Sequence, residues 1–168
     1  GATAQHWDCD LLVVGSGAGA LSTAVTAAHL GLKVIVVEKD PHYGGTTAWS
    51  GGWMWIPRNP LALKGGIAEP IEKPLSYLRH ELGEQFDEKR ALALLTHGPR
   101  MLRFFEEHTA LEFIDGNGIP DFHGRTPDAV LGGCSVCAAP FDGRLLGPKI
   151  RQLKTPLHET TFLGMGIA

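Results

Sequence analysis

The chain has 168 residues, a formal net charge of -3, 43% apolar and 20% charged residues, and three cysteines. This is the length and composition of about one soluble globular domain. The small negative charge excludes electrostatic attraction to nucleic acid or an anionic membrane surface, and the odd, low cysteine count excludes a disulfide scaffold, so we expect reduced thiols and a cytoplasmic protein.

The first ten residues, GATAQHWDCD, lack the basic segment and apolar run of a signal peptide. Residues 11–30 are mostly apolar over about the length of a membrane span. However, they contain Ser16, Thr23 and His29 and divide into an extended-type run and a helix-type run. We therefore expect no transmembrane segment.

The segment from residue 11 to residue 38 predicts a strand, a turn, a helix and a second strand. Residues 11–14 and 34–37 are short β-prone apolar runs, as in buried parallel strands. Residues 21–30 are almost all apolar or small, which suits a helix packed on a sheet, and Gly31 ends that helix. The predicted fold class is α/β, with a Rossmann-like βαβ unit and a parallel sheet that is incomplete in this chain.

The turn in this unit, GSGAGA, fits the pattern G-x-G-x-x-A at Gly15, Gly17 and Ala20. Gly15 permits the tight turn, Gly17 lets a pyrophosphate approach the backbone, and Ala20 keeps helix and strand close. The helix N-terminus then offers free N–H groups and a positive dipole end. Glu38, after the second strand, can accept hydrogen bonds from ribose hydroxyls. The pattern predicts a dinucleotide site without distinguishing NAD from FAD.

A second glycine-rich element, GGTTAWSGGWMWIP at residues 44–57, distinguishes between these cofactors. A nicotinamide dehydrogenase would continue with further βα units, whereas this element can wrap the pyrophosphate and approach a flavin ring. We expect its tryptophans, Trp49, Trp53 and Trp55, to pack in the core rather than stack on the cofactor. The predicted FAD-binding residues are Gly15, Ser16, Gly17, Ala18, Gly19, Ala20, Glu38, Lys39, Gly45, Thr46, Thr47, Ser50, Gly51 and Gly52.

After residue 57 the pattern becomes helical and then irregular. Residues 59–74 resemble a loop. Helices are predicted at 75–82, at 87–95 and from the Gly98-Pro99 break to about residue 108, and a strand is predicted at 111–114. We expect three segments: 1–57, 58–114 and a loop-rich 115–168. No local element is expected to bury eight apolar residues of the last segment: Ile119, Phe122, Val130, Leu131, Val136, Phe141, Leu145 and Leu146.

Cys134 and Cys137 have the C-x-x-C spacing of redox or metal sites. A zinc site needs a second pair of ligands, and only Cys9 remains. The pair is also not preceded by the strand and helix signature of a redox motif. We expect ordinary loop cysteines and no metal.

Residues 10–57 resemble the amino terminus of the flavoprotein family that includes fumarate reductase, succinate dehydrogenase and 3-ketosteroid dehydrogenases. GGTTAWSGGWMWIP is most similar to the 3-ketosteroid Δ1-dehydrogenase branch, and the stretches PDFH, LGG and PFDGRLLG are similar to that branch as well. The resemblance covers nearly the whole chain and is densest over residues 10–57.

The resemblance implies the amino-terminal part of an enzyme with non-covalent FAD, which desaturates a CH–CH bond beside the ketone of a 3-ketosteroid or similar small molecule and passes hydride to flavin N5. It implies that a second polypeptide or a further segment completes the fold and holds most catalytic tyrosines. The catalytic position present here is Phe122, where relatives carry a tyrosine; phenylalanine has no hydroxyl to relay a proton. The paired cysteines replace a charged pair of the relatives. Two alternatives remain: a fumarate-reductase-like enzyme, and a non-catalytic FAD-binding subunit of a heteromeric complex.

Overall fold

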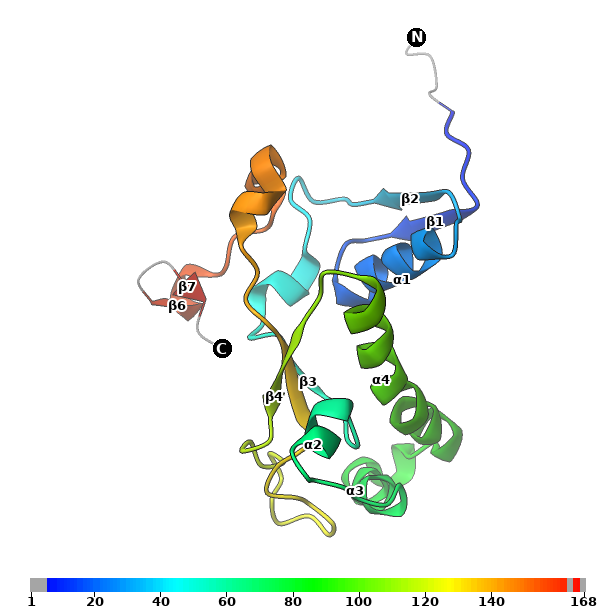
Figure 1. Ribbon diagram of the computed structural model, residues 1–168, viewed down its shortest axis with the longest axis vertical. Helices are drawn as coiled ribbons and strands as arrows, with labels where there is room; N and C mark the ends of the chain where they lie inside the picture. The colour runs from blue at the N-terminus through cyan, green and yellow to red at the C-terminus, as the bar shows by residue number, and fades with distance from the viewer. Residues whose placement is uncertain (1–5, 163–164, 167–168) are drawn as a thin grey trace. The chain divides into compact units, whose positions relative to one another are not determined.

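The structure is a computed structural model that describes residues 6–162, 165 and 166. It divides into two compact units. The first unit comprises the chain up to Gly52 and from Phe141 onward, and the second unit comprises Trp53–Pro140 (Figure 1). The division into domains that the sequence predicted, at 1–57, 58–114 and 115–168, stays a prediction.

The first unit contains the predicted βαβ arrangement. Strands β1 (Leu11–Val14) and β2 (Val34–Val37) pair in parallel, with Leu11 opposite Val34 and Val14 opposite Val37. Helix α1 (Ala18–His29) connects the two strands and lies against them in Figure 1, with Ala24 and Ala27 buried. The fold-class prediction is confirmed. The helix begins three residues earlier than the predicted Leu21, because extended Gly17 acts as its N-cap.

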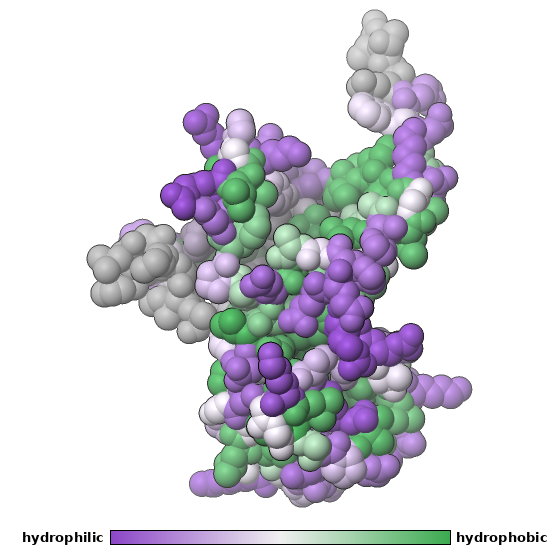
Figure 2. All heavy atoms as spheres, in the orientation of Figure 1, coloured by the Kyte–Doolittle hydropathy of each residue, from purple (hydrophilic) through white to green (hydrophobic). Residues whose placement is uncertain are grey.

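Apolar residues remain exposed on this two-stranded sheet and on its helix. Val14 is 78% exposed and Leu12 is 54% exposed, although both belong to a strand type that is normally covered on both faces. Figure 2 shows apolar surface over the region where β1, β2 and α1 lie. The sheet therefore has the incomplete cover that the sequence predicted.

The carboxyl-terminal part of the first unit pairs with the segment after β2. Tyr43 forms a parallel bridge with Leu153, and its N–H donates to Gln152 O at 2.8 Å. The elements here are the 3-10 helices η1 (Gly45–Trp49), η3 (Gly143–Gln152) and η4 (His158–Thr160) and the hairpin strands β6 (Thr161–Phe162) and β7 (Met165–Gly166).

The second unit combines an antiparallel sheet with helices. The sheet has the strand order β3-β5-β4, with β3 at Trp53–Trp55, β4 at Phe113–Gly116 and β5 at Ser135–Ala138. The helices are α2 (Pro60–Lys64), α3 (Glu72–Leu82), η2 (Gly83–Gln85) and α4 (Glu88–His108). The buried core between sheet and α4 consists of Ile56, Leu102, Phe105, Phe113 and Val136.

The predicted helix break at Gly98-Pro99 is wrong, because α4 continues through both residues. Proline removes one backbone donor, which normally weakens a helix interior. Both residues are buried, and a Cβ on Gly98 would lie 3.0 Å from Ile56 Cγ2. Burial of this close contact offsets the lost hydrogen bond, so packing overrides the local signal.

Two elements lie inside segments predicted as loops. Helix α2 follows Asn59, whose side chain accepts from the Ala62 N–H at 2.9 Å, and Pro60 occupies the first helical position. Strand β5 lies at the centre of its sheet and leaves Val136 0% exposed, so the expectation that nothing local buries Val136 is wrong. The strand predicted at 111–114 begins two residues later, at Phe113.

Across the described part of the chain, the helices are too short or too polar to span a membrane.

Candidate functional site

The turn between β1 and α1 has the backbone of a phosphate-binding loop. Gly15 has a φ of +100°, and a Cβ built there would meet no heavy atom within 4 Å, so this backbone faces open space. Gly17 caps α1, whose first turn carries no acidic side chain. The Ala18 N–H donates to Thr47 Oγ1 at 3.0 Å. The N-terminus of α1, with its positive dipole end and no acidic side chain, is thus suited to an anion.

The two glycine-rich elements are in direct backbone contact. Gly45 has a φ of +57°, and a Cβ built there would lie 3.1 Å from Gly17 Cα and 3.3 Å from Gly17 N. The Gly44 N–H donates to Ser16 Oγ at 3.0 Å, and Gly44 itself has a φ of +122°. Glycine at position 45 therefore allows the second element to close on the first.

Ser16 connects this contact to Glu38. The buried Ser16 hydroxyl donates to Glu38 Oε2, and the Asp40 N–H donates to Glu38 Oε1 at 3.0 Å. These hydrogen bonds, led by that of Ser16, lower the pKa of the Glu38 carboxyl. Glu38 is therefore an ionised acceptor at neutral pH, held at the end of β2 where the sequence predicted a ribose contact.

A second group of contacts holds the returning chain against the glycine elements. Lys154 Nζ lies 2.8 Å from Asp40 Oδ2 and 4.6 Å from the centre of the Trp49 ring. The Trp49 indole N–H donates to Thr155 O at 3.1 Å. The sequence predicted neither these contacts nor a place for Gly44 among the site residues. Sequence offers no signal for the Trp49–Thr155 pair, whose members are 106 positions apart.

The described residues fit an FAD pyrophosphate and ribose. The α1 N-terminus, open space at Gly15 and an ionised Glu38 are the donor and acceptor set that these groups require. The structure brings Gly15, Ser16, Gly17, Ala18, Glu38, Gly45 and Thr47 together. Lys39, Thr46 and Ser50 are exposed on the same unit, and Ser50 Oγ donates to Thr47 O at 2.8 Å.

A family profile described as an FAD binding domain matches residues 10–162. The chain belongs to the FAD binding domain family. Its cofactor is FAD, as the two glycine-rich elements predicted.

Two curated relatives of this FAD binding domain chain are dehydrogenases by name. The 3-oxosteroid 1-dehydrogenase of Mycolicibacterium smegmatis is 40% identical over 92% of this chain and 27% of its own length. The 4-oxocyclohex-2-ene-1-carboxylate 5-dehydrogenase of Sinomonas cyclohexanicum is 36% identical over 93% of this chain and 26% of its own length. The chain thus spans about a quarter of the length of these relatives.

A solved structure agrees with the sequence relatives. The crystal structure of 3-ketosteroid delta1-dehydrogenase from Sterolibacterium denitrificans, in complex with 1,4-androstadiene-3,17-dione, superposes with a TM-score of 0.85 and 36% sequence identity. It covers 93% of this chain, which corresponds to 28% of that structure. The predicted resemblance to the 3-ketosteroid Δ1-dehydrogenase branch is confirmed.

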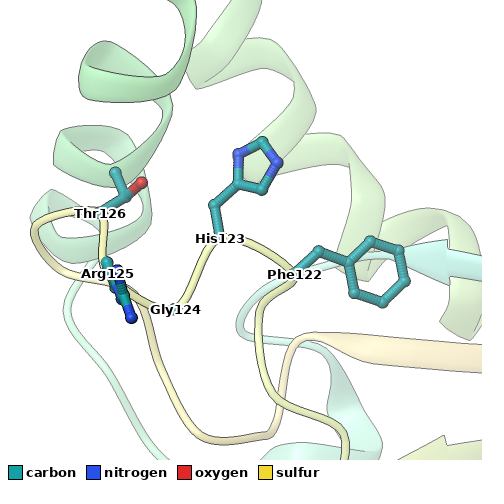
Figure 3. Close-up of a pocket in the computed structure, with 5 residues that line it drawn as sticks. All are labelled: Phe122, His123, Gly124, Arg125 and Thr126. Atoms are coloured by element: carbon teal, nitrogen blue, oxygen red, sulfur yellow. The ribbon is translucent and has the colours of Figure 1, made fainter.

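Phe122 lies on a fixed loop of the second unit and is 94% exposed. The buried Asp121 carboxylate accepts from the Trp55 indole N–H and the Val130 N–H, both at 2.9 Å. On the other side of Phe122, the His123 ring contacts the Glu81 carboxylate. Figure 3 shows Phe122 and His123 pointing in different directions from this loop. The catalytic assignment of position 122 stays a prediction.

Replacing Glu38 by alanine should weaken FAD binding by about tenfold or more, because one charge-assisted hydrogen bond is lost. Isothermal titration of the apoprotein with FAD measures this change. Glu106→Ala removes an exposed carboxylate of the second unit and should leave the affinity for FAD unchanged. Unchanged affinity in Glu38→Ala would remove Glu38 from the cofactor site.

Cys134 and Cys137 are buried thiols of the second unit that form no disulfide. Burial raises the pKa of both, and Cys134 Sγ lies 3.6 Å from Glu69 Oε1. In the described residues no cluster of three or more His, Cys, Asp or Glu side chains could hold a metal ion. Cys134→Ser with Cys137→Ser should leave the FAD content unchanged; stoichiometric zinc in the parent protein, or loss of flavin in the variant, would contradict this.

Proposed function

We propose that this chain is the FAD-binding part of a flavin-dependent dehydrogenase that desaturates a CH–CH bond beside a ketone, with 3-ketosteroids as the substrate class. The observation that carries the proposal is the match to the Sterolibacterium dehydrogenase over 93% of the chain at 36% identity. The name of the mycobacterial relative supports the same reaction class.

In this function the chain binds and orients the cofactor. The N-terminus of α1, with its dipole, holds the pyrophosphate, and ionised Glu38 accepts from the ribose. When bound, FAD supplies the hydride acceptor for the oxidation. Phe122 has no ionisable group, so it shapes the substrate site and leaves proton removal to a residue outside this chain.

A further polypeptide segment completes the fold in this proposal. Phe122, Leu131 and Leu145 are 94%, 89% and 75% exposed, which supports a covering partner. We also place the protein in the cytoplasm, which its reduced cysteines support.

The experiment that tests the function is anaerobic titration of the FAD-loaded protein, completed by its remaining segment, with 4-androstene-3,17-dione. We expect the flavin absorbance to bleach and a steroid product with one more C=C bond to form in equal amount. Denaturation should release FAD rather than FMN. A flavin that stays oxidised with every ketosteroid tested would refute the proposal.

A further inference from the structure

A cleft of about 380 Å³ lies in the second unit beside Phe122. Its walls include the rings of Trp53, Trp55 and Phe122, which offer apolar faces to a ring-shaped ligand. The Trp55 ring also packs on Tyr77, with ring centres 5.7 Å apart. A cleft with these aromatic walls suits a compact alicyclic molecule.

The same cleft is bordered by the carboxylates of Glu81 and Asp121. Glu81 accepts from the Thr126 hydroxyl and contacts His123, and these partners lower its pKa. Asp121 is buried, and its carboxyl oxygens accept from the Trp55 indole N–H and the Val130 N–H. Glu81 and Asp121 therefore place negative charge beside the apolar walls.

Positive groups near the cleft are few among the described residues. His123 lines the cleft but is engaged with Glu81. Arg125 lines a neighbouring hollow with Phe122 and His123, and Figure 3 places it beyond Gly124 on the loop. The two carboxylates thus dominate the charge at the cleft itself.

Tyr77 also lines this cleft. Burial raises the pKa of Tyr77, and the charges of Glu81 and Asp121 raise it further. The phenol therefore stays protonated at neutral pH and can donate a hydrogen bond, whereas it is a poor base.

We propose that this cleft receives a neutral alicyclic ketone, whose carbonyl oxygen accepts from Tyr77, and that it disfavours ketones carrying a carboxylate. The proposal rests on the proposed function for the identity of the ligand as a ketone. A carboxylate placed beside Glu81 and Asp121 would meet like charges at the cleft. The names of the two curated relatives differ in this feature, since one specifies an oxosteroid and the other an oxocyclohexene carboxylate.

The test compares methyl 4-oxocyclohexanecarboxylate with 4-oxocyclohexanecarboxylate, which share a ring and a ketone but differ in charge. The rate of flavin reduction by each, as kcat/KM, is measured with the FAD-loaded, completed protein. We expect the ester to be favoured by about tenfold or more, and the ratio to fall as NaCl is raised, because salt screens the repulsion. Equal rates, or a preference for the acid, would overturn the proposal.

Two variants assign the selectivity to residues. Glu81→Gln keeps an acceptor for Thr126 and removes the charge, so the ester-to-acid ratio should fall severalfold toward one. Glu84→Gln makes the same charge change at an exposed position of η2 and should leave the ratio unchanged. Tyr77→Phe should lower kcat/KM for both compounds alike. If Glu81→Gln is fully folded and FAD-loaded and its ester-to-acid ratio is unchanged, the assignment to Glu81 is contradicted.

A binding measurement distinguishes failure of the proposed function from failure of the cleft's selectivity. If neither compound reduces the flavin, binding is measured instead through quenching of tryptophan emission, since Trp53 and Trp55 line the cleft. Tighter binding of the ester than of the acid then upholds the cleft's selectivity while the reaction is lost. Equal binding, or no binding of either compound, overturns the selectivity as well.

Discussion

Replacing Gly45 by valine is expected to abolish FAD binding while the second unit remains folded. The residue has a φ of +57°, which β-branched side chains rarely adopt. Its new Cβ would lie 3.1 Å from Gly17 Cα and 3.3 Å from Gly17 N. These are backbone atoms of the predicted pyrophosphate loop, and they cannot turn aside as a flexible side chain can. The two glycine elements would separate, and the cofactor loop would lose its shape.

The flavin-to-protein absorbance ratio of the purified variant measures this effect. Gly118→Val is a matched control, because Gly118 is exposed and a Cβ there would meet no heavy atom within 4 Å. It should retain the parent FAD content, and both variants should keep the near-ultraviolet signal of the second unit's aromatic residues. Full FAD occupancy in Gly45→Val would show that the contact with Gly17 does not shape the site.

The part of the fold that sequence predicted depends on neighbours in the chain. β1 and β2 have the predicted bounds, because each is an unbroken apolar run ended by glycine or a charged residue. Gly15, Gly17 and Glu38 belong to the same short unit, so their spacing predicted a common site. Close packing of Gly45 on Gly17 agrees with the choice of FAD over NAD.

The part that sequence did not predict depends on distant partners. β5 lies in a stretch rich in glycine, and its pairing with β3 and β4 makes Val136 a core residue. Helix α4 crosses Pro99 because the core packs around it. Lys154 contacts Asp40 and Trp49, which lie more than a hundred positions earlier in the chain, and no periodic pattern in the sequence indicates this contact. In each case long-range packing outweighs local propensity.

The 168-residue chain alone is expected to be insoluble, or soluble and poor in FAD, and co-expression with a longer carboxyl-terminal polypeptide is expected to restore both properties. Phe122 and Leu131 are 94% and 89% exposed, yet Asp121 fixes their loop through the Trp55 indole and the Val130 N–H. Fully burying one such side chain stabilises a protein by about 1.5–3 kcal/mol. A rigid loop that presents apolar groups to water favours association with a covering surface.

The parallel sheet of the first unit leads to the same expectation. Val14 and Leu12 are exposed on β1, although strands of a parallel sheet are normally covered on both faces. Phe122→Ser with Leu131→Ser should raise the solubility of the chain alone without restoring FAD, because these residues belong to the second unit and the FAD-binding glycines to the first. Sedimentation velocity and flavin content measure the two effects separately. A monodisperse, FAD-saturated monomer of the unaltered chain would contradict the expectation, since its exposed apolar residues would then need no covering partner.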